Sequence, residues 1–111
     1  MTSATTRSSS GSDEMHAGPT ADELLSCLED QYTRQIVTAL QGGPMPARDI
    51  VAACDCSRPT VYRRLKELKA ATVVTTAMRY DPDGHHRKVF TLQVDQITLK
   101  LQSDGIIVHT S

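Results

Sequence analysis

The sequence predicts a single α+β domain in which helical segments are followed by two β-hairpins. Three observations lead to this prediction. Apolar residues between positions 20 and 70 recur at the three- and four-residue spacing of amphipathic helices. The β-branched segment 72–76 then begins a stretch that favours strands. Finally, the turn sequences Asp-Pro-Asp-Gly at 81–84 and Asp-Gly at 104–105 each separate two such strands.

The composition is consistent with one ordinary domain. The chain has 111 residues, of which 39% are hydrophobic, with one Phe and no Trp, so aliphatic side chains must fill the core. No apolar run approaches the roughly 18 residues that span a membrane, and the N-terminus lacks the pattern of a signal peptide. The three cysteines form no disulfide framework. We therefore expect a cytoplasmic protein with reduced thiols and no membrane contact.

The first half of the chain is expected to contain a tail and then helix. Residues 1–19 are rich in Ser, Thr and Gly without apolar periodicity, which predicts a disordered tail. Thr20 and Glu23 have the spacing of a capping box, so order should begin there. The segment should end at Gly-Gly-Pro, 42–44. Because the chain can bend near 29–30, the pattern fits either one helix or two before that point. The expected inward-facing residues are Leu24, Leu25, Leu28, Tyr32, Ile36, Val37 and Leu40.

Two further helices are expected after this stop. A short helix should cover Ala47–Cys54, and a tight turn should lead to a helix at about 57–70. Ser57 is a good N-cap for this second helix, and Pro59 falls in its first turn, where proline is tolerated. The inner stripe consists of Val61, Leu65 and Leu68, and the helical period directs Pro59, Arg63, Lys66 and Ala70 outward.

Two hairpins should complete the fold. The first joins the strand at 72–76 to a return strand at 87–94. The second begins with the alternating segment 97–102, and a type I′ loop at Asp-Gly would pair Ser103 with Ile106 and Leu101 with Val108. Because an isolated hairpin is marginal in water, its apolar face must cover the core or meet another subunit. That face consists of Ile97, Leu99, Leu101, Ile106 and Val108. The expected units are thus a tail (1–19), a domain (20–94) and a C-terminal hairpin (95–111).

Charge is unevenly distributed along the chain. Residues 1–56 carry three basic and eight acidic groups (−5), residues 57–90 carry eight basic and three acidic groups (+5), and the last 21 residues sum to −1. A chain polarised in this way can present one positive face to a polyanion although its net charge is −1. Chance clustering on a solvated surface remains the alternative at this point.

The expected order of elements is that of a winged helix-turn-helix: two helical segments, a short helix, a basic helix and a hairpin. Residues 20–94 resemble winged helix-turn-helix regulators of the ArsR-like group, particularly small archaeal members. The resemblance is carried by the stretches 30–36 (DQYTRQI), 47–51 (ARDIV), 57–65 (SRPTVYRRL) and 81–87 (DPDGHHR). It implies a dimeric transcription regulator whose recognition helix contacts bases and whose wing contacts the DNA backbone. ArsR-like proteins commonly end in a dimerising helix, whereas a hairpin is expected here.

The predicted partner is therefore double-stranded DNA, bound by a homodimer. A recognition helix enters the major groove with its N-terminal residues leading, and Arg can donate two hydrogen bonds to guanine. The wing would lie over phosphates or the minor groove, with Arg48 as a further candidate for the backbone. The predicted DNA-facing residues are Ser57, Arg58, Pro59, Thr60, Tyr62, Arg63 and Lys66 in the helix, and His85, His86, Arg87 and Lys88 in the wing.

Two alternatives remain open. The winged helix could serve as a protein-interaction module, or Cys54 and Cys56 could make the regulator responsive to metal or redox state. A tetrahedral zinc site needs four ligands, so Cys27 or His85 would have to converge on this pair. The sequence shows no phosphate-binding glycine loop, no metalloprotease pattern and no paired carboxylates where a cleft is expected. We therefore expect no enzyme, no cofactor and no bound metal, and we identify no small-molecule effector.

Overall fold

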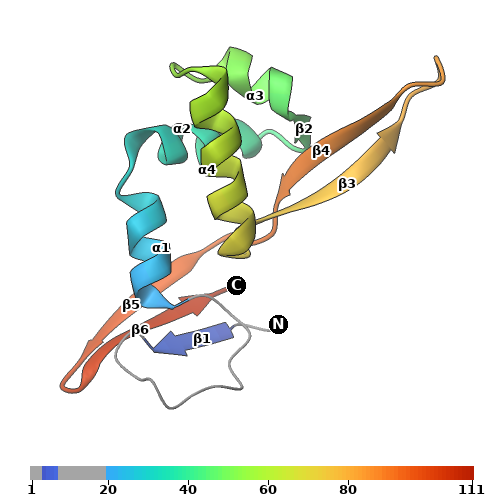
Figure 1. The fold of residues 1–111 in the computed structure, drawn as a ribbon. Helices are drawn as coiled ribbons and strands as arrows, with labels where there is room; N and C mark the ends of the chain where they lie inside the picture. The colour runs from blue at the N-terminus through green and yellow to red at the C-terminus, as the bar shows by residue number, and fades with distance from the viewer. Residues whose placement is uncertain (1–3, 8–19) are drawn as a thin grey trace.

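The structure is a computed structural model that describes residues 4–7 and 20–111. It confirms the α+β class, with helices packed on a wing-like sheet and a C-terminal hairpin (Figure 1). The helices are α1 (Ala21–Leu28), α2 (Gln31–Leu40), α3 (Ala47–Ala53) and α4 (Arg58–Ala70), and the strands are β1 (Ala4–Arg7), β2 (Met45–Pro46), β3 (Val74–Tyr80), β4 (His86–Leu92), β5 (Ile97–Gln102) and β6 (Gly105–Thr110). No helix in these ranges is long and apolar enough to cross a bilayer.

Local capping explains why the first helical segment forms two helices. The Glu23 amide donates to the Thr20 hydroxyl at 3.1 Å while the Thr20 amide donates to the Glu23 carboxylate at 2.7 Å, which completes the predicted capping box of α1. After α1, Asp30 takes an extended conformation and its carboxylate accepts from the Thr33 amide, starting α2. The Arg34 guanidinium donates to the carbonyls of Leu28 and Glu29 at the end of α1, which holds the bend closed.

The turn between α3 and α4 is fixed by polar contacts. The Asp55 amide donates to the Gln35 side chain on α2 at 2.8 Å. Ser57 caps α4 as predicted, because its hydroxyl accepts from the Thr60 amide, and Pro59 lies in the first turn. The direction in which α4 leaves the turn is therefore set by residues within a few positions of its start.

The end of α4 explains why the next strand begins later than expected. The sequence predicted a strand over 72–76, whereas β3 starts at Val74 and continues to Tyr80. Thr72 has a φ of +59°, and the amides of Thr72 and Val73 donate back to the carbonyls of Lys69 and Leu68. This is a Schellman ending with threonine at the position that glycine usually takes. The two residues that follow α4 thus close the helix instead of starting the strand.

The strands form two separate three-stranded sheets. One has the order β2-β4-β3 and contains the predicted wing, whose turn at 81–84 is closed by the Gly84 amide donating to the Asp81 carbonyl. The other has the order β1-β6-β5. Figure 1 shows the two hairpins extending away from the helices in opposite directions, with α1 lying against β6. The return strand of the wing covers His86–Leu92, close to the predicted 87–94.

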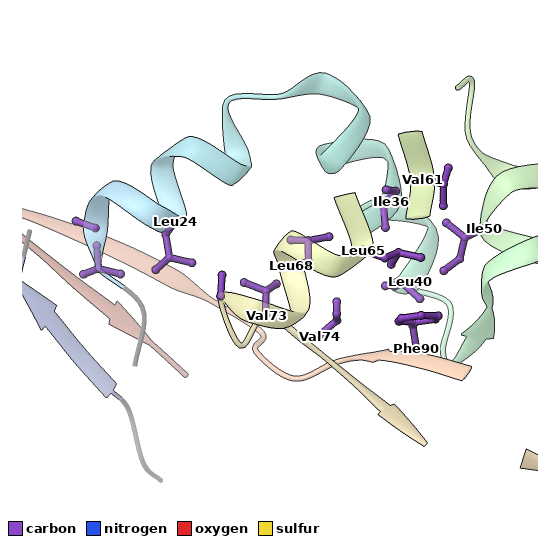
Figure 2. Packing of buried hydrophobic residues seen from close by; sticks show 13 residues of the cluster. Leu24, Ile36, Leu40, Ile50, Val61, Leu65, Leu68, Val73, Val74 and Phe90 are labelled. Carbon is purple, nitrogen blue, oxygen red and sulfur yellow. The ribbon is translucent and has the colours of Figure 1, made fainter. Parts of the chain in front are cut away.

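The hydrophobic core lies between the helices and the inner ends of both hairpins (Figure 2). The predicted inner stripe of α4 is confirmed, since Val61, Leu65 and Leu68 are all buried. Val108 of β6 is also fully buried and joins the same cluster. The C-terminal hairpin therefore covers part of the core. The other buried members are Ala21, Leu24, Ile36, Leu40, Ile50, Ala71, Val73, Val74 and Phe90.

The predicted register of the C-terminal hairpin is wrong by two residues. Leu101 pairs with Ile106, and Leu99 pairs with Val108. A type I′ loop needs positive φ at both central residues, but in the described ranges only Thr72 among non-glycine residues has a positive φ. The loop is instead Ser103-Asp104, and Gly105 takes the positive φ of +142°. A shift of two keeps the predicted apolar residues on one face.

Two strands were not predicted, the two-residue β2 and the N-terminal β1. Residues 4–7 form β1, which pairs antiparallel with β6 from Ala4 opposite Thr110 to Arg7 opposite Ile107. For these four residues the prediction of a disordered tail is therefore corrected. The short polar strand has no apolar alternation of its own, and its pairing partner lies a hundred residues away, so no local pattern marks it. The rest of the predicted tail, 1–3 and 8–19, lies outside the described residues.

Candidate nucleic-acid interface

The outer face of α4 is exposed along its length. Pro59, Arg63 and Lys66 are exposed on the side opposite the buried stripe, as the helical period predicts. Among residues 4–7 and 20–111, no carboxylate lies within ion-pair distance of Arg63 or Lys66. These two side chains therefore present unneutralised cations and hydrogen-bond donors to the solvent.

The first turn of α4 holds its polar side chains in pairs. The Arg58 guanidinium donates to the Tyr62 hydroxyl at 3.1 Å and lies 5.9 Å from the centre of its ring. The Ser57 and Thr60 hydroxyls are 2.9 Å apart. Four of the predicted DNA-facing residues are thus preorganised as two pairs. Ser57 is also engaged in capping, which leaves Arg58 and Tyr62 as the more available pair.

A groove of about 690 Å³ lies between α4, the start of α3 and the wing. No carboxylate is among its lining residues. A groove whose charged lining residues are all cations concentrates a positive potential and suits a polyanion such as a phosphodiester chain. Six basic residues line it: Arg48, Arg58, Lys66, Lys69, Arg87 and Lys88.

Lys69 lines the groove but was not among the predicted DNA-facing residues. Arg48 also lines it and was predicted only as a further candidate for a backbone contact. Lys69 lies seven residues after Tyr62, so the helical period alone places both on one side of α4 and was a usable signal. Arg48 lies at the start of α3, ten residues before α4. Its place on the groove wall depends on how α3 packs against the wing, which no local pattern encodes.

Arg87 of the wing differs from the expected free phosphate partner. Its Nε lies 2.8 Å from the Asp81 carboxylate, which Arg79 also approaches at 3.4 Å. Asp81 therefore neutralises part of the wing's positive charge. Lys88 is exposed, and its Nζ lies 5.6 Å from the centre of the Phe90 ring at the groove wall. Of the two wing cations, Lys88 is the one available to a ligand.

Both wing histidines have partners within the hairpin. His85 Nδ1 lies 3.0 Å from the Asp83 carboxylate, and the His86 ring packs edge-on against Tyr80 at 4.5 Å between ring centres. Hydrogen bonds from the His85 backbone amide and then from its side chain lower the pKa of Asp83. The loop carboxylate thus stays ionised and places a negative charge beside His85 at the wing tip.

Arg64 points inward, although its neighbour Arg63 points outward. Its Nε lies 3.1 Å from the Asp30 carboxylate and its Nη1 lies 3.1 Å from Glu67 on α4 itself. Hydrogen bonding from the Thr33 amide is the main reason that the pKa of Asp30 is lowered, and Arg64 adds to this effect against the opposing effect of burial. The ionised Asp30 thus both caps α2 and anchors α4 on it.

Replacing Asp30 should therefore destabilise the domain. Asp30→Ala is expected to lower the free energy of unfolding by about 1–2 kcal/mol through the lost N-cap. Asp30→Asn should cost less, because asparagine caps as well and loses only the charge facing Arg64. Since the folded pKa of Asp30 is lowered, its contribution is complete above about pH 4 and is lost as the pH falls through the folded value. Urea unfolding of both variants between pH 7 and 3 tests this, and equal stability of Asp30→Ala and the parent at pH 7 would contradict it.

The cysteines do not assemble a metal site in the described residues. Within 4–7 and 20–111, no three His, Cys, Asp or Glu side chains gather closely enough to hold a metal ion. Burial, followed by the neighbouring Cys56, raises the pKa of the Cys54 thiol, and all three cysteines are free thiols. A raised pKa disfavours the thiolate, which is the reactive and metal-binding form. Within the described ranges, Cys54 and Cys56 therefore have no third ligand with which to hold a metal ion.

Comparisons with known proteins point to the same elements. Residues 28–77 match a protein family described as "Helix-turn-helix domain". The chain is also 33% identical over 66 residues to the "Probable tellurium resistance transcriptional regulator TerW" of Escherichia coli and of Serratia marcescens. The aligned part makes up 59% of this chain and 41% of each relative, so the chain spans about two fifths of the curated relatives it matches.

The matched segment coincides with the elements that build the groove. It begins at the last residue of α1 and extends through the turn and α4 into β3, the first strand of the wing. The structure adds the return strand β4 and thereby completes the wing beside α4. Residues 28–77 are therefore similar to a helix-turn-helix domain, and the structure shows a wing-like hairpin directly after it.

Proposed function

We propose that this protein is a sequence-specific transcription regulator that binds double-stranded DNA. The observation that carries the proposal is the groove beside α4, which six cations and no carboxylate line. In the proposed complex α4 lies in the major groove and the wing at 81–88 lies on the backbone or in the minor groove. The similarity to proteins named as transcriptional regulators supports the same role.

The side chains divide into two roles. Arg58 and Arg63 lie at the exposed start of α4, where a bidentate pair with guanine O6 and N7 can form, and Thr60 and Tyr62 accompany them. The groove cations Arg48, Lys66, Lys69 and Lys88 neutralise phosphates and position the protein without reading sequence.

Arg63→Ala tests the reading role of α4. We expect the affinity for the specific site to fall about 10- to 100-fold, because one good base contact contributes about 1–3 kcal/mol of discrimination. Binding to unrelated duplex DNA should change much less. The measurement is fluorescence anisotropy with a site selected from random DNA, and Lys100→Ala on β5 serves as an exposed control far from the groove.

The melting temperature of the variant distinguishes a lost base contact from a folding defect. Arg63 is exposed and has no ion-pair partner in the described part of the chain, so the variant should melt at the same temperature as the parent. If Arg63→Ala and Arg58→Ala both bound the selected site as tightly as the parent does, α4 would not be the reading element.

We also propose that the regulator acts as a homodimer in the cytoplasm. On the C-terminal sheet, Leu99 and Leu101 are 44% and 81% exposed, and β5 lies at the edge of the described sheet. A twofold pair through this surface would present two copies of α4 to a pseudo-palindromic site. Sedimentation equilibrium should give twice the chain mass of 12.1 kDa, and Leu101→Lys should shift it toward the monomer. A strict monomer for the parent would refute the dimer.

A further inference from the structure

One face of the wing is apolar and aromatic well beyond the core. The register of the hairpin places Thr76 opposite Phe90, Met78 opposite Lys88 and Tyr80 opposite His86, and these three pairs share one face. Phe90 at the inner end is buried, whereas Met78 and Tyr80 further out are 52% and 68% exposed. Neither exposed side chain is needed to cover the core.

This face continues the groove described above. Phe90 and Lys88 line the groove beside α4, and Met78 and Tyr80 follow on the same face toward the wing tip. Arg79 and Arg87 alternate with these residues along the strands, and Asp81 engages both guanidinium groups, although Arg87 also lines the groove. The face that adjoins the reading helix thus combines one available cation with a large thioether and an aromatic ring.

We propose that Met78 and Tyr80 form an apolar DNA contact in the minor groove next to the major groove that α4 occupies, an inference that rests on the proposed function. Strands rise about 3.4 Å per residue, so Tyr80 lies roughly 14 Å beyond the level of Phe90. Half a turn of B-DNA is about 17 Å, which separates neighbouring grooves. Apolar side chains are well suited to the sugar-lined minor groove and to partly opened base steps.

The chemistry of this contact differs from that of the groove cations. A Lys or Arg that neutralises a phosphate releases a counterion, so its contribution fades with salt. Met78 and Tyr80 release no counterions. Their burial against sugars and bases therefore contributes affinity at any ionic strength. The side chain of His86 packs edge-on against Tyr80 and holds the ring in place. The wing thereby supplies a salt-independent part of the DNA affinity.

The experiment measures DNA affinity against salt for the Met78→Ala/Tyr80→Ala double variant. We expect affinity about tenfold or more below the parent at every salt concentration, with an unchanged slope of log affinity against log salt. Lys88→Ala, the neighbouring cation, should instead reduce the slope by about 1. Tyr80→Phe should retain the parent's affinity because it keeps the ring. Hydroxyl-radical footprinting should show loss of the wing's minor-groove protection only in the double variant.

The outcomes distinguish this inference from the proposed function. If the double variant kept the parent's affinity and footprint while Arg63→Ala lost specific binding, the apolar contact would be refuted and the DNA-binding function would stand. A double variant with normal DNA affinity but an altered oligomeric mass would also refute it, since the face would then be a protein interface. Both substitutions are at exposed positions, so an unchanged melting temperature confirms that folding is not the cause.

Discussion

Raising the salt concentration from about 50 to about 200 mM is expected to weaken duplex-DNA binding by a few hundred- to a thousandfold. The groove provides six cations, and each phosphate that a cation neutralises contributes about −0.9 to the slope of log affinity against log salt. Four to six such contacts give a slope of about −3.6 to −5.4, which over a fourfold change in salt amounts to about two to three powers of ten. Anisotropy titrations with one duplex at several salt concentrations measure this slope.

A substitution in the groove and one in the neighbouring wing turn should change the slope in opposite directions. Lys69→Gln removes one cation from the wall and should make the slope shallower by about 1. Asp81→Asn removes the carboxylate that engages Arg79 and Arg87, so the slope should become steeper as these arginines become available to phosphates. Lys100→Gln on β5, outside the groove, should leave the slope unchanged. A parent slope near zero would show that the groove does not bind the DNA backbone.

The features that the sequence predicts well are those determined within a few residues. The capping box at Thr20, the N-cap at Ser57 and the stripe of Val61, Leu65 and Leu68 depend on spacing along one helix, and the structure contains all of them. The same holds for the wing turn, where Gly84 takes a φ of +88° as the turn sequence predicts. Local chemistry therefore suffices for the order of the helices and of the two hairpins, and for the outward direction of Arg63.

The features that the sequence predicts poorly depend on contacts between residues far apart in the chain. Arg64 and Arg63 are adjacent in sequence, but only the position of Asp30 at the start of α2 makes Arg64 a structural anchor. The engagement of Arg87 by Asp81 and the approach of Arg48 to the groove likewise depend on tertiary packing. The hairpin register failed for a different reason. Asp-Gly permits two turn geometries, and the choice between them moves the pairing by two residues without changing which face is apolar.

Leu68→Ala is expected to have the largest effect on folding. Leu68 is fully buried on the inner side of α4 and belongs to the cluster labelled in Figure 2. Removing a buried leucine side chain costs about 2–5 kcal/mol, a large fraction of the 5–15 kcal/mol by which such domains are stable. Chemical denaturation followed by circular dichroism measures the loss. Leu68→Met conserves volume and should cost less than about 1.5 kcal/mol.

The neighbouring residue makes this prediction a test of the two faces of α4. Lys69 is exposed, so Lys69→Ala should change stability by no more than about 0.5 kcal/mol while it reduces the salt slope of DNA binding. Leu68→Ala should lower the stability and leave the salt slope unchanged, because the groove cations are intact at temperatures where the variant is folded. If Leu68→Ala reduced the salt slope of the folded protein, or Lys69→Ala unfolded it, the assignment of the inner and outer faces would be wrong. Adjacent positions on one helix thus separate what holds the fold from what contacts DNA.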